Sequence, residues 1–302
     1  MQRGERALAG DYFEYHVEEG RRILALYSLW LRHLLDYARD RVPALDDEIQ
    51  RLTGLIGVEP PIVEAEAIGE QEAAAGRLAV ERGSDSELAV VVAELRDECR
   101  AVHDAQADWC WGLLTILRDA LGEDAMDEVF RVTQGAWVSE RYAALAEMTP
   151  EESFQLTIEG MRGHHSGRLR DGHIDVVEDD EKWVMSFDPC GSGGRMRRGD
   201  PARGQTPRED PPFEFGRTER PHDWSWNRTG VCLYCAHCAV VNEILPIEQL
   251  GSPMRVTDNP EEPGDPCTWT IYKHPELVPD EAYRRVGKPP PRRDTSSDPG
   301  LP

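Results

Sequence analysis

The sequence predicts an α+β fold, in which a helical N-terminal half is followed by a small, irregular α+β half that binds a metal. Apolar residues recur at spacings of three and four through most of the first 162 residues, the period of one helical face. After Gly163, apolar and polar residues alternate, which is the period of a strand. Three of the seven cysteines also lie within a short run of this second half. The expected regions are a helical domain, a cysteine-rich α+β domain and a disordered tail, at residues 1–162, 163–286 and 287–302.

The long helices of the first half are predicted from periodicity and from residues that begin and end helices. Residues 11–40 form an amphipathic helix that Pro43 ends, and residues 44–56 form a second one. A polar, alanine-rich stretch follows. Ser84 then offers helix-start chemistry for a long amphipathic helix that ends at Gly122.

Three shorter helices complete the predicted helical half. Two of them cover residues 124–132 and 135–147. The third begins at the sequence TPEE, residues 149–152, which combines a capping box with proline at the first helical position. This helix is expected to run to about Met161.

The second half contains a predicted hairpin, a long loop and a final strand. Alternating residues on either side of an acidic turn at residues 178–181 predict the two strands of the hairpin. Residues 188–222 are rich in Gly, Pro, Arg and Asp and form a long loop, of the kind that is functional or disordered. We expect a brief helix over residues 239–250, interrupted at Pro246, and a last strand over residues 268–272.

Charge and composition exclude several classes of function. A net charge of −23 argues against binding to nucleic acid or to anionic membrane surfaces, because phosphate groups require a basic face. No stretch approaches the roughly 18 apolar residues of a membrane span, and the N-terminus has no apolar core of the signal-peptide kind. We therefore expect a cytoplasmic protein, in which clustered cysteines bind metal or take part in catalysis rather than form disulfides.

The cysteine run VCLYCAHCA predicts a metal site. Cys232, Cys235 and Cys238 stand at three-residue intervals, and thiolates this close repel one another unless a cation or an oxidised bond relieves them. Zinc takes about four ligands, and a C-x2-C pair supplies two of them. Cys190, Cys267 or a histidine would complete the site.

An iron–sulfur cluster is the alternative cofactor. A C-x2-C-x2-C run with a distant fourth cysteine after a proline, here Pro266-Cys267, is similar to ferredoxin-type runs. The absence of a close fourth cysteine departs from that pattern, so zinc, iron and an iron–sulfur cluster all stay open. Free thiols without a metal are the structural alternative.

Three histidines precede the cysteine run. His164 and His165 are adjacent at the end of a predicted helix, where neighbouring side chains diverge by about 100°, so one of the two would meet a given metal. We predict His164 or His165 as a metal ligand and His173 as a proton shuttle. A purely structural role is the alternative.

The run DPCGSGGR, which follows the predicted hairpin, predicts a substrate site. Asp188 and Cys190 leave the end of the strand, the first as a second candidate proton shuttle and the other as a nucleophile or metal ligand. Its glycines would let backbone N–H groups converge on a negative charge, and Arg195 could bind a carboxylate through two hydrogen bonds. These glycines are Gly191, Gly193 and Gly194. A flexible glycine loop is the alternative.

Two tryptophans lie just before the cysteine run. Trp224 and Trp226 are predicted to wall the substrate pocket or to cover the metal site, and packing in the core is the alternative.

These motifs resemble those of a known bacterial family. The helical front half, DPCGSGGR, GVCLYCAHC and the terminal PCTWTIYK together look like the family related to 2-amino-thiazoline-4-carboxylate hydrolase. The resemblance covers about residues 155–273. It implies hydrolytic ring opening of a small sulfur- or nitrogen-containing carboxylate. The cysteine run is richer than this family leads one to expect, which keeps redox chemistry open.

The leading hypothesis is a metal-dependent hydrolase or lyase that acts on a small polar substrate carrying a carboxylate. Cys232, Cys235 and Cys238 would hold the ion, and an open coordination position would lower the pKa of a bound water to about 7. An iron–sulfur oxidoreductase or electron-transfer protein is the second hypothesis. The third is a zinc-stabilised, non-catalytic adaptor whose acidic helical half binds a partner. The helical half is also a candidate homodimer interface.

Overall fold

The computed structural model describes residues 3–167 and 170–292 and has an α+β fold. A helical N-terminal region, which ends at Gly163, is followed by a mixed region with a four-stranded antiparallel sheet. The predicted fold class is confirmed at this level. The predicted boundary after residue 162 falls next to the end of the last N-terminal helix.

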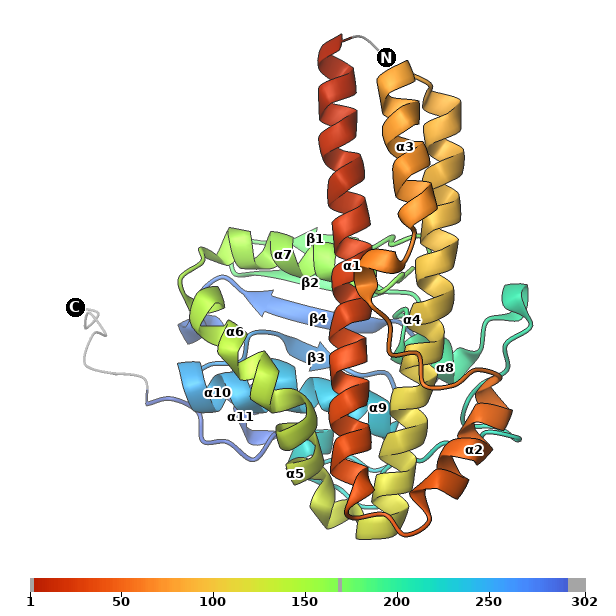
Figure 1. The fold of residues 1–302 in the computed structure, drawn as a ribbon. Coiled ribbons are helices and arrows are strands. Elements are labelled where there is room, and N and C mark those ends of the chain that lie inside the picture. Colours follow the sequence, from red (N-terminus) through yellow and green to blue (C-terminus); the bar gives the residue numbers. More distant parts are fainter. Residues whose placement is uncertain (1–2, 168–169, 293–302) are drawn as a thin grey trace, which may run out of the picture.

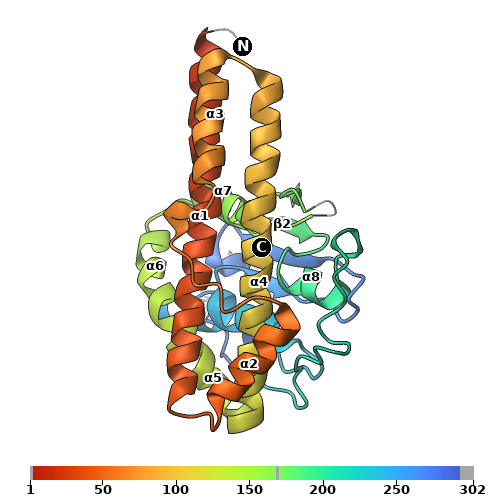
Figure 2. The same ribbon diagram turned by 45° about the vertical axis from the view of Figure 1, so that its right-hand side comes forward.

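Two long helices form the axis of the molecule (Figures 1 and 2). Helices α1 (Arg3–Arg39) and α4 (Asp85–Leu121) pack along each other, and each contains 37 residues. As predicted, Ser84 begins α4, because its side chain accepts a hydrogen bond from the Glu87 N–H, and Gly122 follows its last residue.

Helix α3 (Glu70–Arg82) joins α1 and α4 in a three-helix bundle that projects beyond the rest of the molecule (Figure 1). It lies in the alanine-rich stretch for which periodicity predicts no element. Its buried face consists of the small residues Ala73, Gly76 and Ala79, so no large apolar stripe marks the helix in the sequence.

The remaining N-terminal helices surround the lower part of this axis: α2 (Leu45–Ile56), α5 (Met126–Phe130), α6 (Ala136–Ala146) and α7 (Pro150–Gly163). The capping box that begins α7 is confirmed, because Thr149 and Glu152 exchange hydrogen bonds between side chain and backbone N–H in both directions. A π-helical turn joins α5 to α6, where the sequence predicts a gap between two helices.

The sheet has the strand order β1-β2-β4-β3. The predicted hairpin is confirmed as β1 (Asp175–Glu178) and β2 (Lys182–Phe187), and the predicted last strand as β4 (Cys267–Tyr272). Strand β3 (Val256–Asp258) was not expected, because three residues are too few to show a period. One face of the sheet is buried on α7, where Phe154 stacks on Trp183.

Short helices connect the strands. Helix α8 (Gly193–Arg198) lies inside the predicted long loop, and α9 (Leu233–Cys238) carries part of the cysteine run. A π-helical segment leads from α9 into α10 (Leu245–Leu250), where Pro246 occupies the first turn. The chain stays helical through Pro246, so the predicted interruption is wrong, and the helix changes from π to α just before the proline. Helix α11 (Asp280–Arg284) follows the sheet.

The largest buried cluster combines apolar residues from both halves of the chain, including side chains of α1, α4 and α9. Trp224 and Trp226 belong to this core, each 4% exposed, so both pack in the interior. Of the predicted tail, residues 287–292 contain neither helix nor strand, and residues 293–302 lie outside the described residues. Within the described residues, none of the helices combines the length and apolarity that a membrane crossing requires.

Candidate functional site

Four cysteines line one cavity at the junction of the two halves. Its volume is about 60 Å³, enough for a few water molecules or a small ligand group. Apolar side chains form most of the remaining wall, and two histidines, His164 and His237, also reach it. The four cysteines are Cys190, Cys235, Cys238 and Cys267.

Three separate segments deliver these thiols. Cys190 follows the end of β2, and Cys267 begins β4 and pairs with Phe187 at that same end. Cys235 and Cys238 are three residues apart on α9, so both side chains lie on one helical face. The antiparallel pairing of β2 with β4 thus brings together cysteines 77 residues apart in the sequence.

Protein contacts occupy part of the glycine run that was predicted to bind a negatively charged group. Gly191 packs against the backbone of His164, and its N–H donates to Ser166 Oγ, so it offers no hydrogen bond to a ligand. Gly193 and Gly194 line the cavity. A Cβ on Gly193 would lie 2.6 Å from Cys235 Sγ, so the absence of a side chain there makes room for the thiol.

Burial and hydrogen bonding change the pKa values of the thiols in the cavity. It raises the pKa of both Cys238 and Cys267, and the neighbouring cysteines raise these pKa values further. The pKa of Cys235 is instead lowered, first by a hydrogen bond with the Cys232 thiol and then by Arg197. Cys232 is buried and accepts a hydrogen bond from the Cys235 N–H, so it caps α9 and does not line the cavity.

The five predicted zinc ligands are not assembled around one point. Cys235, Cys238 and His164 line the cavity, whereas Cys232 caps its helix and His165 faces a separate groove. Among residues 3–167 and 170–292, no group of three His, Cys, Asp or Glu side chains could hold a single metal ion. The donor set therefore does not fit the predicted mononuclear zinc site.

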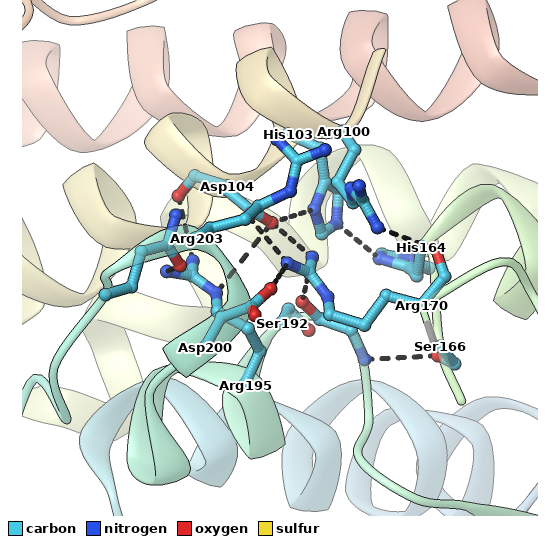
Figure 3. Close-up of polar contacts among 12 residues, drawn as sticks. Arg100, His103, Asp104, His164, Ser166, Arg170, Ser192, Arg195, Asp200 and Arg203 are labelled. Carbon is cyan, nitrogen blue, oxygen red and sulfur yellow. Dashed lines mark hydrogen bonds and ion pairs between the residues drawn. The ribbon is translucent and has the colours of Figure 1, made fainter. Parts of the chain in front are cut away.

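A carboxylate and two imidazoles form a relay that ends at the cavity (Figure 3). His103 Nδ1 lies 3.4 Å from Asp104 Oδ1, and His103 Nε2 lies 3.2 Å from His164 Nδ1. Because a carboxylate only accepts, His103 carries its proton on Nδ1 and accepts from His164 at Nε2. His164 then holds its proton on Nδ1, which leaves Nε2 as a proton acceptor in a side chain that lines the cavity.

Burial keeps both histidines of the relay neutral. It lowers the pKa of His103, and it lowers the pKa of His164, as do the neighbouring His103 and His237. Burial opposes the charge of Asp104, yet Arg195 and Arg170 outweigh it and hold the pKa of that carboxyl below its ordinary value. The relay thus consists of an ionised carboxylate and two neutral imidazoles at pH 7.

Hydroxyl groups connect the relay to Cys190. Tyr27 OH lies 3.4 Å from His164 Nδ1 and forms a hydrogen bond with Tyr234 OH. The Ser192 hydroxyl is near enough to both tyrosines to lower their pKa values, and its Oγ lies 3.5 Å from Cys190 Sγ. A continuous polar path therefore leads from the helical half to the cavity.

His237 and Cys238 form a second polar pair in the wall. His237 Nδ1 donates to the Tyr234 carbonyl oxygen, which leaves Nε2 as the acceptor, 3.6 Å from Cys238 Sγ. Burial lowers the pKa of His237 to about 4, so the imidazole is neutral at pH 7. Its Nε2 is therefore placed to accept a hydrogen bond from the Cys238 thiol.

Two neighbouring cavities share wall residues with the thiol-lined cavity, directly or in turn. A second cavity of about 200 Å³ shares His164, His237 and Cys238 with the first. It in turn shares Arg255 and Trp269 with a surface groove of about 710 Å³ between α1, α6 and α7. The second cavity therefore lies between the thiol-lined cavity and the surface groove.

Arg255 lines both the second cavity and the surface groove. Its guanidinium donates to Asn242 Oδ1 and Thr157 Oγ1 and lies over the Trp269 ring. Both hydrogen-bond partners are neutral, and no ion pair joins Arg255 to a carboxylate in the part of the chain that the structure describes. These three hydrogen bonds leave two of its five N–H donors for a ligand.

The other predicted site residues lie elsewhere. His173 is exposed and contacts Asp175 at 3.2 Å, and Asp188 forms an ion pair with Arg198 at 2.5 Å. Arg195 was expected to bind substrate, but its buried guanidinium forms an ion pair with Asp108 on α4. None of the three groups predicted to move a proton or clamp a carboxylate here lines the cavity.

Sequence reasoning missed the contribution of the helical half. It sought chemistry after residue 163, whereas Tyr27 comes from α1, and His103 and Asp104 come from α4. One signal was present, because Asp104 and Asp108 interrupt a stretch of α4 that is otherwise mostly apolar and is buried nearly all round. A charge at such a position requires a partner.

No protein-family model, curated protein or solved structure matches this chain. The likeness to the 2-amino-thiazoline-4-carboxylate hydrolase family therefore depends on the short motifs alone.

Proposed function

We propose that the protein is a hydrolase or lyase that acts on a small, carboxylate-bearing substrate in the thiol-lined cavity. The observation that carries the proposal is the Asp104–His103–His164 relay, which ends on the cavity wall with a neutral proton acceptor. The reaction class agrees with the one that the motif resemblance implies.

His164 is the general base of the proposed reaction. Its Nε2 would take a proton from water in a hydrolysis, or from a substrate carbon in an elimination. The positive charge that forms on the ring is stabilised through His103 by the ionised Asp104. Asp104 is a positioning residue, because it fixes the tautomer of His103 and through it that of His164.

Arg255 orients the substrate. Its two remaining N–H donors match the two oxygens of a carboxylate, and the buried site strengthens such a pair. Arg255 also lines the two cavities through which a ligand would reach His164. Arg255 therefore takes the role that the sequence suggested for Arg195.

The proposal assigns proton transfer to protein side chains. The sequence predicted that a zinc-bound water would act in the reaction. No group of three His, Cys, Asp or Glu side chains in residues 3–167 and 170–292 could hold that zinc ion. His164 supplies the base function that this water was expected to need, and it does so from a position that the structure connects to Asp104.

A substrate screen tests the proposal. The purified chain is incubated with small cyclic and linear carboxylates, and products are followed by mass spectrometry. His164→Gln keeps a polar side chain but removes the base, so we expect a loss of about 10²–10⁴-fold in kcat/KM. His173→Gln is the control, because that exposed side chain does not line the cavity. Equal losses in both variants, or full activity in His164→Gln, would contradict the assignment.

A further inference from the structure

We infer that a second groove, between α1, α4 and α7, binds an amphiphilic monocarboxylate, with its carboxylate at Arg96 and His16 and its apolar tail along α4. This groove has a volume of about 590 Å³, within the range of sites that hold small molecules. Among the described residues, none lines both this groove and the thiol-lined cavity. The inference therefore concerns a separate site and does not depend on the reaction proposed above.

Helices α1 and α4 form the two long walls of the groove (Figure 1). The walls extend over residues 9–20 of α1 and 88–99 of α4, roughly 16 Å along each helix. Gly20 lies opposite Cys99 at the end next to α7, because a Cβ on Gly20 would lie 3.3 Å from Cys99 Sγ. His165 also lines the groove, and its ring lies 5.6 Å from that of His103. A ligand in the groove would therefore contact a residue that packs on the relay.

Two buried polar atoms near this end of the groove have no partner. His16 Nε2 and Arg96 Nε form no hydrogen bond within the described residues, although water does not reach either atom. Each lies about one helical turn from Gly20 or Cys99, so both belong to the end next to α7. A buried polar group without a partner is unfavourable, so a ligand that hydrogen-bonds to these atoms would be bound favourably.

The charges around His16 favour an anion. After burial, Arg162 and Arg96 lower the pKa of His16, and they are the charged groups that act on this imidazole. Arg162 has a carboxylate partner in Glu159, at 3.6 Å. In the part of the chain that the structure describes, no ion pair joins Arg96 to a carboxylate. An anion beside Arg96 would supply the missing counter-charge.

The acidic side chains of the groove limit the ligand to one negative charge. Glu19 pairs with Arg22 at 3.2 Å, and Glu159 also has an arginine partner. Asp171 is exposed, so solvent screens its charge. These three carboxylates would still repel a dianion such as phosphate. A single carboxylate matches Arg96, the one cation among the groove residues described for which no ion pair is formed.

The rest of the groove is suited to an apolar tail. Leu88, Val92 and Leu95 lie on one face of α4, at spacings of four and three, and Phe13 lines the groove from α1. Leu88 and Val92 are only partly buried, so a hydrocarbon tail between the helices would remove their exposed apolar surface from water. The groove thus joins an anion-binding end to an apolar slot.

The test measures binding of decanoate to the full chain by titration calorimetry. The neutral 1-decanol keeps the tail without the carboxylate, and decyltrimethylammonium reverses the charge. We expect decanoate to bind about 10–100-fold more tightly than 1-decanol, because its hydrogen bonds are charge-assisted, and the cation to bind most weakly. Hexanoate should bind roughly 100-fold more weakly than decanoate, since each buried methylene group contributes about fourfold.

Four variants locate the site. Arg96→Gln should remove the preference for decanoate over 1-decanol, and Val92→Phe should weaken both ligands by filling the slot. Arg82→Gln is the matched control, because this exposed arginine of α3 pairs with Glu87 at 3.7 Å and does not line the groove. Arg255→Gln separates this groove from the proposed substrate site and should leave decanoate binding unchanged. Circular dichroism establishes that each variant is folded.

A second measurement needs no variant. The His16 imidazole is titrated by nuclear magnetic resonance with and without ligand. Decanoate should raise the pKa of His16, because a carboxylate beside the ring offsets the two arginines, whereas 1-decanol should not. Equal affinity for decanoate and 1-decanol, tighter binding of the cation, or decanoate binding that Arg96→Gln leaves unchanged would each overturn the inference. Loss of decanoate binding in Arg255→Gln but not in Arg96→Gln would place the carboxylate in the other groove instead.

Discussion

At the scale of single residues, hydrogen-bond partners determine what each imidazole can do. The Tyr234 carbonyl makes Nε2 of His237 an acceptor, and Asp104 does the same for His164 through His103. The chemical role of His164 is therefore fixed by a carboxylate that does not contact it.

The buried neutral histidines predict a loss of stability in acid. The folded pKa of His237 is about 4, below the ordinary value of 6.5, so the unfolded chain binds more protons between these values. Stability should then fall as the pH falls from about 6.5 to 4, by about 3 kcal/mol for this one group. Urea unfolding at pH 7 and pH 4.5 measures the difference. His237→Gln should show a smaller decrease, and a decrease equal to that of the wild type would contradict this attribution.

Asp104 is expected to be essential for folding as well as for the relay. It pairs with the buried Arg170, and Arg195 lies 3.8 Å away, so Asp104→Asn leaves buried cations without their full counter-charge. We expect a decrease of about 3–5 kcal/mol in the free energy of unfolding, measured with urea. Asp36→Asn removes an exposed ion pair with Arg39 and should cost less than about 1 kcal/mol. Similar losses in the two variants would show that the buried network contributes little.

At the scale of elements, local chemistry predicted most of the helices. The start of α4 at Ser84 and the capping box of α7 depend on residues adjacent in sequence, so both were found. Helix α3 was not predicted because its buried face carries small residues, and strand β3 was not predicted because it has only three residues. Helix α8 was not predicted because its glycines and arginines give it the same composition as the surrounding loop.

Alanine substitutions at Gly76 in α3 and at Gly54 in α2 should change stability in opposite directions. A Cβ on Gly76 would overlap the Phe13 ring, whereas a Cβ on Gly54 of α2 would meet no atom within 4 Å. Gly76→Ala should therefore destabilise the protein by about 1–3 kcal/mol through overpacking. Gly54→Ala should stabilise it by up to about 1 kcal/mol, since alanine favours a helix. Thermal unfolding compares them, and stabilisation by both would show that Phe13 moves away at little cost.

At the scale of the whole molecule, the site exists only where the two halves meet. The cavity cysteines were within reach of sequence reasoning, because Cys235, Cys238 and the Pro266-Cys267 pair stand in recognisable spacings. Their partners in α1 and α4 were not, because a contact such as His103 with His164 depends on tertiary packing. For the same reason, sequence reasoning predicted that Arg195 binds the substrate carboxylate. In the fold, Arg195 forms an ion pair with Asp108 instead.

The position of Arg255 between the surface groove and the thiol-lined cavity predicts a selective effect on substrate binding. Arg255→Gln removes the cation that the substrate meets on its way to His164, so KM for a carboxylate substrate should rise about 10–100-fold with kcat little changed. Arg255→Lys should recover part of the loss. The neutral amide of the same substrate is the control, and its KM should be nearly the same in wild type and variant. An equal change for acid and amide would remove Arg255 from substrate recognition.

The most direct measurement of the central claim is the pH dependence of kcat/KM for a substrate found in the screen. Burial lowers the pKa of His164, so activity should hold as the pH falls through 6.5 and decline only below it, when the base becomes protonated. His164→Gln should lose this acidic decline together with most of the rate. An acidic decline that persists unchanged in His164→Gln would show that another group is the base.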